Sequence, residues 1–129
     1  MHGSLEKLYC MYCGHTVAYD FELDSSFICF HCKKSGKVRV DVVWFGEQPK
    51  YLDIIYKHLE KTDIFLSIGT SNNVYPAAGF IDYIYGPKKR VELIEFNIEK
   101  TNKSSLFEKS VIGPASITVE KFVRQIVGK

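Results

Sequence analysis

Four cysteines constrain this chain more than any other feature. They are Cys10, Cys13, Cys29 and Cys32, which gives the spacing C-x2-C-x15-C-x2-C. Two residues between cysteines allow one tight turn to direct two sulfurs at a common point, and two such turns supply the four thiolates of a tetrahedral zinc site. We therefore expect a structural zinc ribbon at 10–37, because four sulfurs leave no open position for water. The alternative interpretation is four free or redox-active cysteines.

A zinc ribbon can also bind nucleic acid, and the basic run at 33–39 is compatible with that role. The whole chain, however, carries 17 basic and 15 acidic residues, for a net charge of +2. So short a run in a nearly neutral chain is more typical of a solvated face, and we expect no nucleic-acid partner. His15 and His31 also lie in the ribbon. We interpret both as bystanders, although His31 could replace a cysteine.

Length and composition are those of an ordinary globular protein. The chain has 129 residues, of which 46% are hydrophobic and 25% are charged, enough for one core and a small module. No apolar run reaches the length of a membrane span, and no export signal precedes the cysteines. We therefore expect a cytoplasmic protein with no membrane partner, in a compartment where cysteines bind metal more often than they form disulfides.

The remainder of the chain alternates between strand and helix patterns. The stretch at 38–46 is rich in β-branched residues, and Leu52, Ile55, Tyr56 and Leu59 repeat with helical spacing. The expected elements are a strand at 38–46, a helix from Pro49, a strand at 64–68, a helix from about 76 to Gly86, a strand at 90–99 and a helix at 118–127 stopped by Gly128. This order predicts an α/β fold with a parallel sheet.

Small and polar residues follow two of these strands. Gly69, Thr70 and Ser71 come after the first, and the segment 97–99, with an asparagine and a glutamate, closes the second. Ligands of parallel sheets bind beyond the carboxyl ends of the strands, where hydroxyl, amide and carboxylate groups suit a ribose or an adenine. An ordinary turn and a strand cap are the alternatives at these two places.

Six stretches together resemble the sirtuins, a family of NAD-dependent protein deacylases. They are "HG" ahead of the first cysteine, the cysteine pairs, "VVWFGE", "IGTSNNVYPAAGF", "FNIE" and "IGPAS", and they follow the family order. The wording "NVYPAAGF" is most similar to bacterial deacylases. The resemblance implies the C-terminal half of a Rossmann-like parallel sheet with an inserted zinc ribbon. It divides the chain into a catalytic-histidine segment at 1–9, the ribbon at 10–37 and a partial NAD-binding domain at 38–129.

The resemblance also assigns roles. His2 would be the general base that deprotonates a ribose hydroxyl, after the acyl oxygen of an acylated lysine has displaced nicotinamide, so that the acyl group passes to ADP-ribose. Besides structural Zn²⁺, the cofactor would be NAD⁺. Its adenosine half would contact Gly69, Thr70, Ser71, Asn97, Ile98, Glu99 and Ala115. The acylated peptide or protein would contact Val43, Trp44, Phe45, Gly46, Glu47, Asn73, Val74 and Tyr75.

The chain departs from the family in one large respect. It has no glycine-rich turn for the pyrophosphate, no Asp-Phe-Arg segment and no Gln-Asn-x-Asp stretch, and Val40 stands where proline is usual. We therefore expect a truncated sirtuin in which Met1 is an internal methionine. The isolated chain would be inactive unless a longer gene product or a separate polypeptide supplies the missing half. The alternatives are a non-catalytic zinc-binding module that binds peptides and a decayed gene product.

Overall fold

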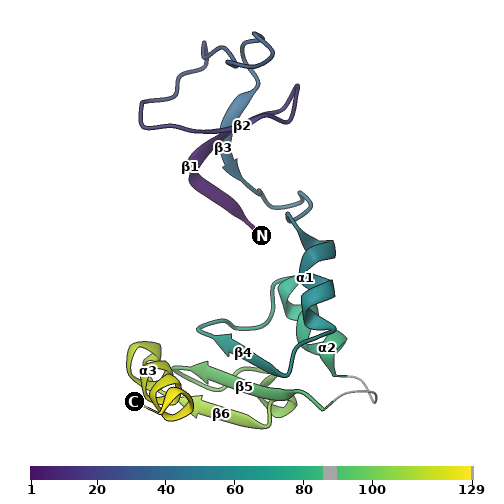
Figure 1. Ribbon diagram of the computed structural model, residues 1–129, viewed down its shortest axis with the longest axis vertical. Helices are drawn as coiled ribbons and strands as arrows, with labels where there is room; N and C mark the ends of the chain where they lie inside the picture. The colour runs from purple at the N-terminus through teal and green to yellow at the C-terminus, as the bar shows by residue number, and fades with distance from the viewer. Residues whose placement is uncertain (86–89, 129) are drawn as a thin grey trace. The chain divides into compact units, whose positions relative to one another are not determined.

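A computed structural model describes residues 1–85 and 90–128 of the chain. The chain divides into two compact units, Met1–Leu52 and Asp53–Lys129 (Figure 1). Strand β3 belongs to the first unit, whereas the resemblance places Val38 at the start of the NAD-binding segment. Among the described residues, no helix combines the length and the hydrophobicity that a membrane crossing would need.

The first unit is a small antiparallel sheet that carries two cysteine turns. Its strands are β1 (Gly3–Cys10), β2 (Thr16–Ala18) and β3 (Val38–Val42), in the order β2-β1-β3. Leu8 of β1 is opposite both Val17 and Val40 and is only 1% exposed. The register of β1 against β3 shifts between Ser4 and Leu8. Apolar burial in this sheet therefore centres on a single leucine.

The position of β3 corrects one prediction. The sequence pattern makes 38–46 the first strand of the parallel sheet, but β3 pairs antiparallel with β1. The reason is that β1, which sequence reasoning did not find, provides a partner within the same unit. A run of β-branched residues indicates a strand but does not specify the strand with which it pairs.

The second unit is a parallel sheet covered by helices. Its sheet has the order β4-β5-β6, and both pairings are parallel. The elements are α1 (Leu52–Leu59), β4 (Ile64–Ile68), the 3-10 helix η1 (Ala77–Gly79), α2 (Phe80–Ile84), β5 (Glu92–Asn97), the 3-10 helix η2 (Ser104–Leu106), β6 (Lys109–Ile112) and α3 (Ala115–Val127). The predicted α/β fold with a parallel sheet is confirmed here.

Strand β5 is buried on both faces, as the central strand of a covered parallel sheet should be. On one face Leu93 packs in a cluster with residues of α1 and α2, including Leu59 and Ile81. On the other face Phe96 is fully buried, and its ring lies 5.2 Å from that of Phe122 in α3. Burial of each such side chain is worth about 1.5–3 kcal/mol, so these two layers form the main core of the unit.

Several elements match the sequence-based expectations and others do not. Strand β4 has the predicted bounds, and α3 ends at Gly128, which adopts the left-handed conformation of a helix C-cap. The predicted helix from Pro76 begins as η1 and continues as α2, and its expected end at Gly86 lies outside the described residues. Strand β6 lies in a stretch that the sequence pattern leaves as a loop.

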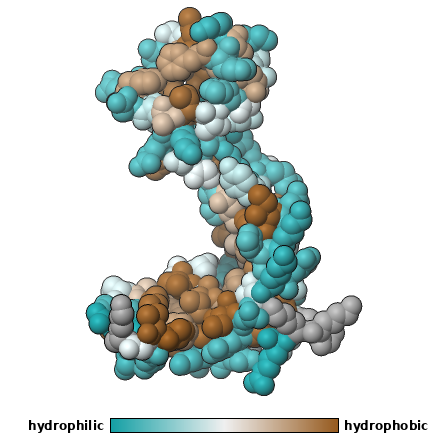
Figure 2. Space-filling view, viewed as in Figure 1, coloured by the Kyte–Doolittle hydropathy of each residue, from teal (hydrophilic) through white to brown (hydrophobic). Residues whose placement is uncertain are grey.

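Hydrophobic side chains also remain on the surface of the second unit. Figure 2 shows them gathered near α3. On β4, Ile64 and Ile68 are 45% and 44% exposed, and on α3, Ile117 and Ile126 are 65% and 58% exposed. An exposed apolar area of this kind is a typical contact surface for another polypeptide.

Candidate functional site

The four cysteines converge as their spacing predicts. Their sulfurs lie within 4.8 Å of one another. The Sγ atoms of Cys10 and Cys32 are 3.7 Å apart, and those of Cys13 and Cys29 are 3.8 Å apart. A tetrahedron with Zn–S bonds of about 2.3 Å has edges of about 3.8 Å, so the donor set fits Zn²⁺. The rings of His15 and His31 stack beside the site with centroids 5.0 Å apart.

The two cysteine turns have the same backbone pattern. In the first, the N–H of Gly14 donates to the carbonyl of Cys10 at 2.8 Å, and the N–H of Cys10 donates to the carbonyl of residue 15 at 2.9 Å. In the second, Lys33 donates to Cys29, and Cys29 donates to residue 34, both at 2.9 Å. Gly14 and Lys33 occupy the same place in the two turns and both have positive φ, 71° and 60°. Only the first turn uses a glycine there, so a non-glycine residue must adopt the left-handed conformation in the second.

Close packing of the sulfurs perturbs their protonation. The backbone N–H of His15 favours the Cys13 thiolate, but desolvation and the other three sulfurs outweigh it and raise the pKa of Cys13 to about 12. Backbone N–H groups, led by that of Cys32, lower the pKa of Cys29 to about 6. Four thiols this close cannot all ionise unless a cation offsets their repulsion. The site therefore favours a divalent metal that prefers sulfur.

The predicted general base lies at the open end of β1. The His2 side chain is exposed, and its carbonyl accepts a hydrogen bond from Val43 N at 2.9 Å. Gly3 has a φ of 88°, and a Cβ there would lie 1.8 Å from the carbonyl oxygen of Asp41. No other residue type fits so close an approach of β1 to β3, so the glycine fixes the backbone that presents the imidazole.

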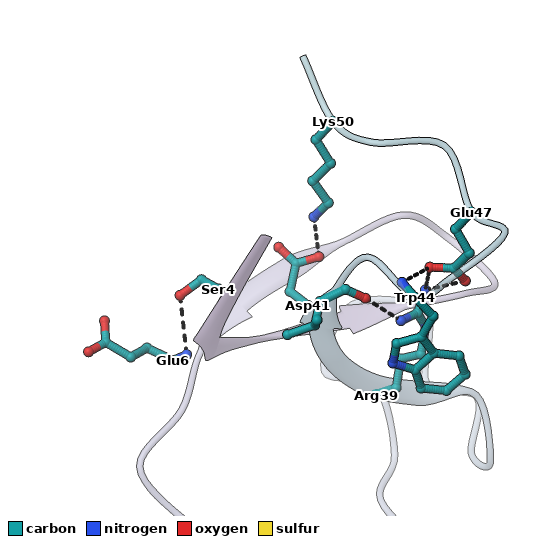
Figure 3. A network of polar contacts seen from close by, with 8 residues as sticks. Ser4, Glu6, Arg39, Asp41, Trp44, Glu47 and Lys50 are labelled. Carbon is teal, nitrogen blue, oxygen red and sulfur yellow. Dashed lines mark hydrogen bonds and ion pairs between the residues drawn. The ribbon is translucent and has the colours of Figure 1, made fainter. Parts of the chain in front are cut away.

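The segment that follows β3 is held by one arginine (Figure 3). Arg39 Nη2 donates to both carboxylate oxygens of Glu47, at 2.7 and 2.8 Å, and Nη1 donates to the carbonyl of Val42 at 2.6 Å. The guanidinium lies 4.2 Å from the centroid of the Trp44 ring. The N–H of Trp44 and then the guanidinium of Arg39 hold the pKa of Glu47 below its ordinary value. The side chain of Phe45, between these residues, is fully exposed.

A second ion pair joins the same segment to β3, and a backbone hydrogen bond joins it to the N-terminus. The ammonium of Lys50 donates to Asp41, whose carboxylate is largely buried, and the N–H of Lys50 donates to the carbonyl of Met1 at 2.9 Å (Figure 3). Sequence reasoning placed Arg39 in the basic run at 33–39, interpreted as a solvated face, whereas the structure pairs it with Glu47. Lys50 was not singled out, because charges of both signs within 39–50 form no pattern specific to a function.

In the second unit, the residues expected to meet the cofactor share one edge of the sheet. Gly69, Thr70 and Ser71 follow β4, the segment 97–99 follows β5, and Ala115 begins α3 after β6. Parallel strands place their carboxyl ends together, so these three segments are neighbours. The side chain of Asn97 donates to the carbonyl of Thr70 at 2.9 Å. The residues at 69–71 and 98–99 are exposed, so hydroxyl and carboxylate groups reach the surface at this edge.

The residues expected to meet the peptide are divided between the units. Val43, Trp44, Phe45, Gly46 and Glu47 belong to the first unit, and all but Val43 are exposed. The second unit carries the range 73–75, in which the side chains of Val74 and Tyr75 are 63% and 70% exposed.

Two polar residues that sequence reasoning did not single out are buried beside the cofactor edge. Glu95 in β5 has no exposed surface, and Ser67 in β4 is 5% exposed. The available signal was a charged residue inside the apolar strand "ELIEFN", which is unusual in a central parallel strand.

Comparison with known proteins gives a consistent result. The Sir2 family model matches residues 1–76. The NAD-dependent protein deacylase of Bdellovibrio bacteriovorus is 42% identical over 127 residues, covering 98% of this chain and 52% of that protein. The same enzyme class from Yersinia pseudotuberculosis is 36% identical over 129 residues, covering 98% of this chain and 45% of that protein.

The fold agrees with the sequence matches. The crystal structure of a Sir2 homologue in complex with NAD superposes with a TM-score of 0.84 at 27% identity, covering 98% of this chain and 50% of the other. The chain spans about half the length of the curated relatives it matches. With its cysteine cluster and its parallel sheet in place, this chain belongs to the Sir2 family.

Proposed function

We propose that this chain is part of an NAD-dependent protein-lysine deacylase. The observation that carries the proposal is its similarity, over nearly its whole length, to curated proteins of that name. The cluster of exposed polar groups at the carboxyl ends of β4 and β5 supports it, because this is where parallel sheets bind nucleotides. The substrate would be an acylated lysine in a peptide or protein.

In this proposal the chain contributes a metal site, groups that bind the cofactor and a general base. The four cysteines hold Zn²⁺ and thereby fix the first unit. Thr70, Ser71, Asn97 and Glu99 supply the hydroxyl, amide and carboxylate groups that would hold the adenosine half of the cofactor. NAD⁺, when bound, supplies the ADP-ribose that accepts the acyl group as nicotinamide leaves.

His2 would act as the general base of the reaction. Its imidazole accepts a proton from a ribose hydroxyl, a task suited to the side chain that most often exchanges protons near neutral pH. The hydrogen bond from Val43 to the His2 carbonyl fixes the backbone and leaves the ring free.

Turnover would require the part of the family fold that this chain does not match. About half of each relative lies outside the matched region, and the motifs that contact pyrophosphate and nicotinamide in the family are missing from these 129 residues. A longer gene product or a separate polypeptide would supply them. We place the protein in the cytoplasm, whose reducing conditions keep thiolate ligands available for metal.

The test joins this chain to the unmatched N-terminal part of the Bdellovibrio bacteriovorus deacylase. We expect the chimera to release nicotinamide from NAD⁺ in the presence of an acetyl-lysine peptide, and the chain alone to release none. His2→Ala in the chimera should lower kcat by at least about a hundredfold, the usual contribution of a general base. His58→Ala, which removes an exposed imidazole of α1, is the matched control. A folded, zinc-loaded chimera with no NAD-dependent activity would refute the proposal.

A second candidate is a zinc-containing module that binds peptides without catalysis. The observation in its favour is the full exposure of Phe45 beside the braced segment that follows β3. In that case the chain alone would bind an acetyl-lysine peptide, Phe45→Ala would abolish binding, and the chimera would show no turnover.

A further inference from the structure

Glu95 is a buried carboxylate to which the proposed mechanism gives no role. It has no exposed surface and lies in the middle of the central strand β5. Thr101 Oγ1 donates to Oε1 at 2.8 Å, and the hydroxyls of Ser104 and Ser110 donate to Oε2 at 2.5 and 3.0 Å. Three hydroxyl donors offset the loss of water around this side chain.

Two of these three donors belong to the segment that leaves β5 after Asn97. Thr101 N donates to Ser104 Oγ at 2.8 Å, and Ser104 N donates to the carbonyl of Thr101 at 3.1 Å. The turn at 101–104 is therefore closed on itself and tied to Glu95 by both of its hydroxyls. Ile98 and Glu99 lie on the only stretch of chain between Asn97 at the end of β5 and this turn, so fixing the turn restricts where they can go.

Glu95 is also the centre of a polar row that crosses the sheet. Ser67 of β4 and Ser110 of β6 are its register partners on the two neighbouring strands. Ser67 Oγ donates to Asn72 Oδ1 at 2.9 Å, and Asn72 is buried with a φ of 56°. The row thus holds both segments of the candidate cofactor edge. Ser67 holds the segment Gly69–Ser71 through Asn72, which directly follows it, and Glu95 holds the segment after β5.

If packing alone determined the residue at position 95, burial of a hydrophobic side chain would cost less free energy than burial of a carboxylate. Replacing buried ionic groups by well-packed apolar residues is often neutral or stabilising. Glu95 instead accepts hydrogen bonds through both carboxylate oxygens from hydroxyls of the following loop and of β6. What the carboxylate provides is therefore a fixed loop position.

We propose that Glu95 is a positioning residue that holds the segment 98–104 in the conformation that binds the adenosine half of the cofactor. This inference rests on the proposed cofactor site. Glu95 itself touches no ligand and acts through Thr101 and Ser104.

The test measures ADP-ribose binding and amide hydrogen exchange on the whole chain, both alone and within the chimera that supplies the missing pyrophosphate motifs. Glu95→Gln keeps the shape of the side chain but turns one acceptor into a donor that faces hydroxyl donors. Thr101→Val removes one loop-side hydroxyl and leaves the carboxylate in place. Ser110→Ala is the matched control, because it removes a donor to the same carboxylate from β6 and leaves both loop-side bonds.

We expect Glu95→Gln and Thr101→Val to weaken ADP-ribose binding about tenfold, and Ser110→Ala to stay within about threefold of wild type. Exchange of the amides at 101–107 should accelerate in the first two variants, while the amides of β4 and β5 stay protected. Zinc content should be the same in all four proteins, which checks that the first unit is intact.

Each other outcome contradicts a distinct claim. If wild type binds ADP-ribose and all three variants bind equally well, Glu95 has no positioning role and the cofactor site stands. If the three variants weaken binding equally and exchange rises across the whole sheet, the role of Glu95 is only structural. If wild type binds no ADP-ribose either alone or in the chimera, while its second unit is protected from exchange, the proposed cofactor site is wrong, and the positioning role is wrong with it.

Discussion

The two units of this chain are stabilised by different means. Among the described residues, the buried hydrophobic side chains of the first unit are Leu8 and two cysteines, whereas the second unit buries a continuous cluster around Leu93 and a second layer at Phe96. The first unit compensates with four converging sulfurs and the ion pairs of Arg39 and Lys50. A segment of about 50 residues with so few buried apolar side chains gains little folding free energy from its core. A bound metal therefore has to supply the remainder.

This difference has a functional counterpart. The first unit presents its candidate residues on short segments braced by backbone and ion-pair contacts, as at Gly3 and Glu47. The second unit presents its candidates where strands leave a packed sheet, with the polar row at Glu95 beneath them. Perturbing one unit at a time should therefore separate these two modes of support.

Removal of the metal should unfold the first unit and leave the second folded. Purified protein should contain one zinc per chain, and Cys10→Ser or a strong chelator should abolish it, because a structural metal site supplies folding free energy directly. Amide hydrogen exchange should then rise throughout 1–50 and stay slow in β5. His31→Ala, the control, should keep its zinc. Loss of zinc in that variant would show that the ligand set is not the four sulfurs alone.

The reverse perturbation targets the core of the second unit. Phe96 is fully buried against Phe122, so Phe96→Ala should lower the free energy of unfolding of this unit by about 3–5 kcal/mol. Zinc content should not change. Urea denaturation followed by circular dichroism measures the effect, with Phe45→Ala as a control whose fully exposed ring contributes little. Equal losses in the two variants would contradict the layered core.

A smaller effect is expected from the brace that follows β3. Arg39→Met keeps much of the side-chain length but removes the bonds to Glu47 and to the carbonyl of Val42. The amides of Trp44 and Glu47 should exchange faster, and the single tryptophan should report a looser environment by fluorescence. Zinc and the exchange of β1 should be unaffected, because an ion pair that is partly exposed to solvent contributes modestly. A loss of protection throughout the first unit would mean that Arg39 stabilises the whole unit and not only the segment that follows β3.

The smallest effect concerns an exposed pair in the second unit. Tyr83 donates to Glu60 at 2.8 Å, and this hydrogen bond raises the pKa of Tyr83. A raised pKa of an acid means that the pair stabilises the fold while the phenol is protonated, and that this contribution is lost as pH rises through the folded pKa. Glu60→Gln should bring the Tyr83 titration, followed by NMR, down toward the ordinary tyrosine value near 10. An unchanged midpoint would show that the hydrogen bond does not persist in solution.

The zinc module and the main elements of the second unit could be read from the sequence because their signals are local. The spacing of Cys10 and Cys13 sets the geometry of one turn, and the apolar run at 64–68 occupies one strand. Strand β1 was missed because half of its residues are exposed and its pattern is irregular. Strand β6 was missed because four residues, KSVI, give too short a pattern to distinguish a strand from a loop.

The sequence by itself determined the metal ligands, the alternation of helices and strands from residue 52 to Asn97 and the family resemblance, because each depends on residue identities at short spacing. Only the tertiary structure decided that β3 pairs with β1, that Arg39 braces Glu47, and that Ser67, Glu95 and Ser110 form one row across the sheet. Pairing and register join residues far apart in the chain, and they are selected by the burial of whole faces rather than by any local pattern. For that reason the candidate cofactor residues were named from the sequence, while the buried carboxylate beneath them was found only in the fold.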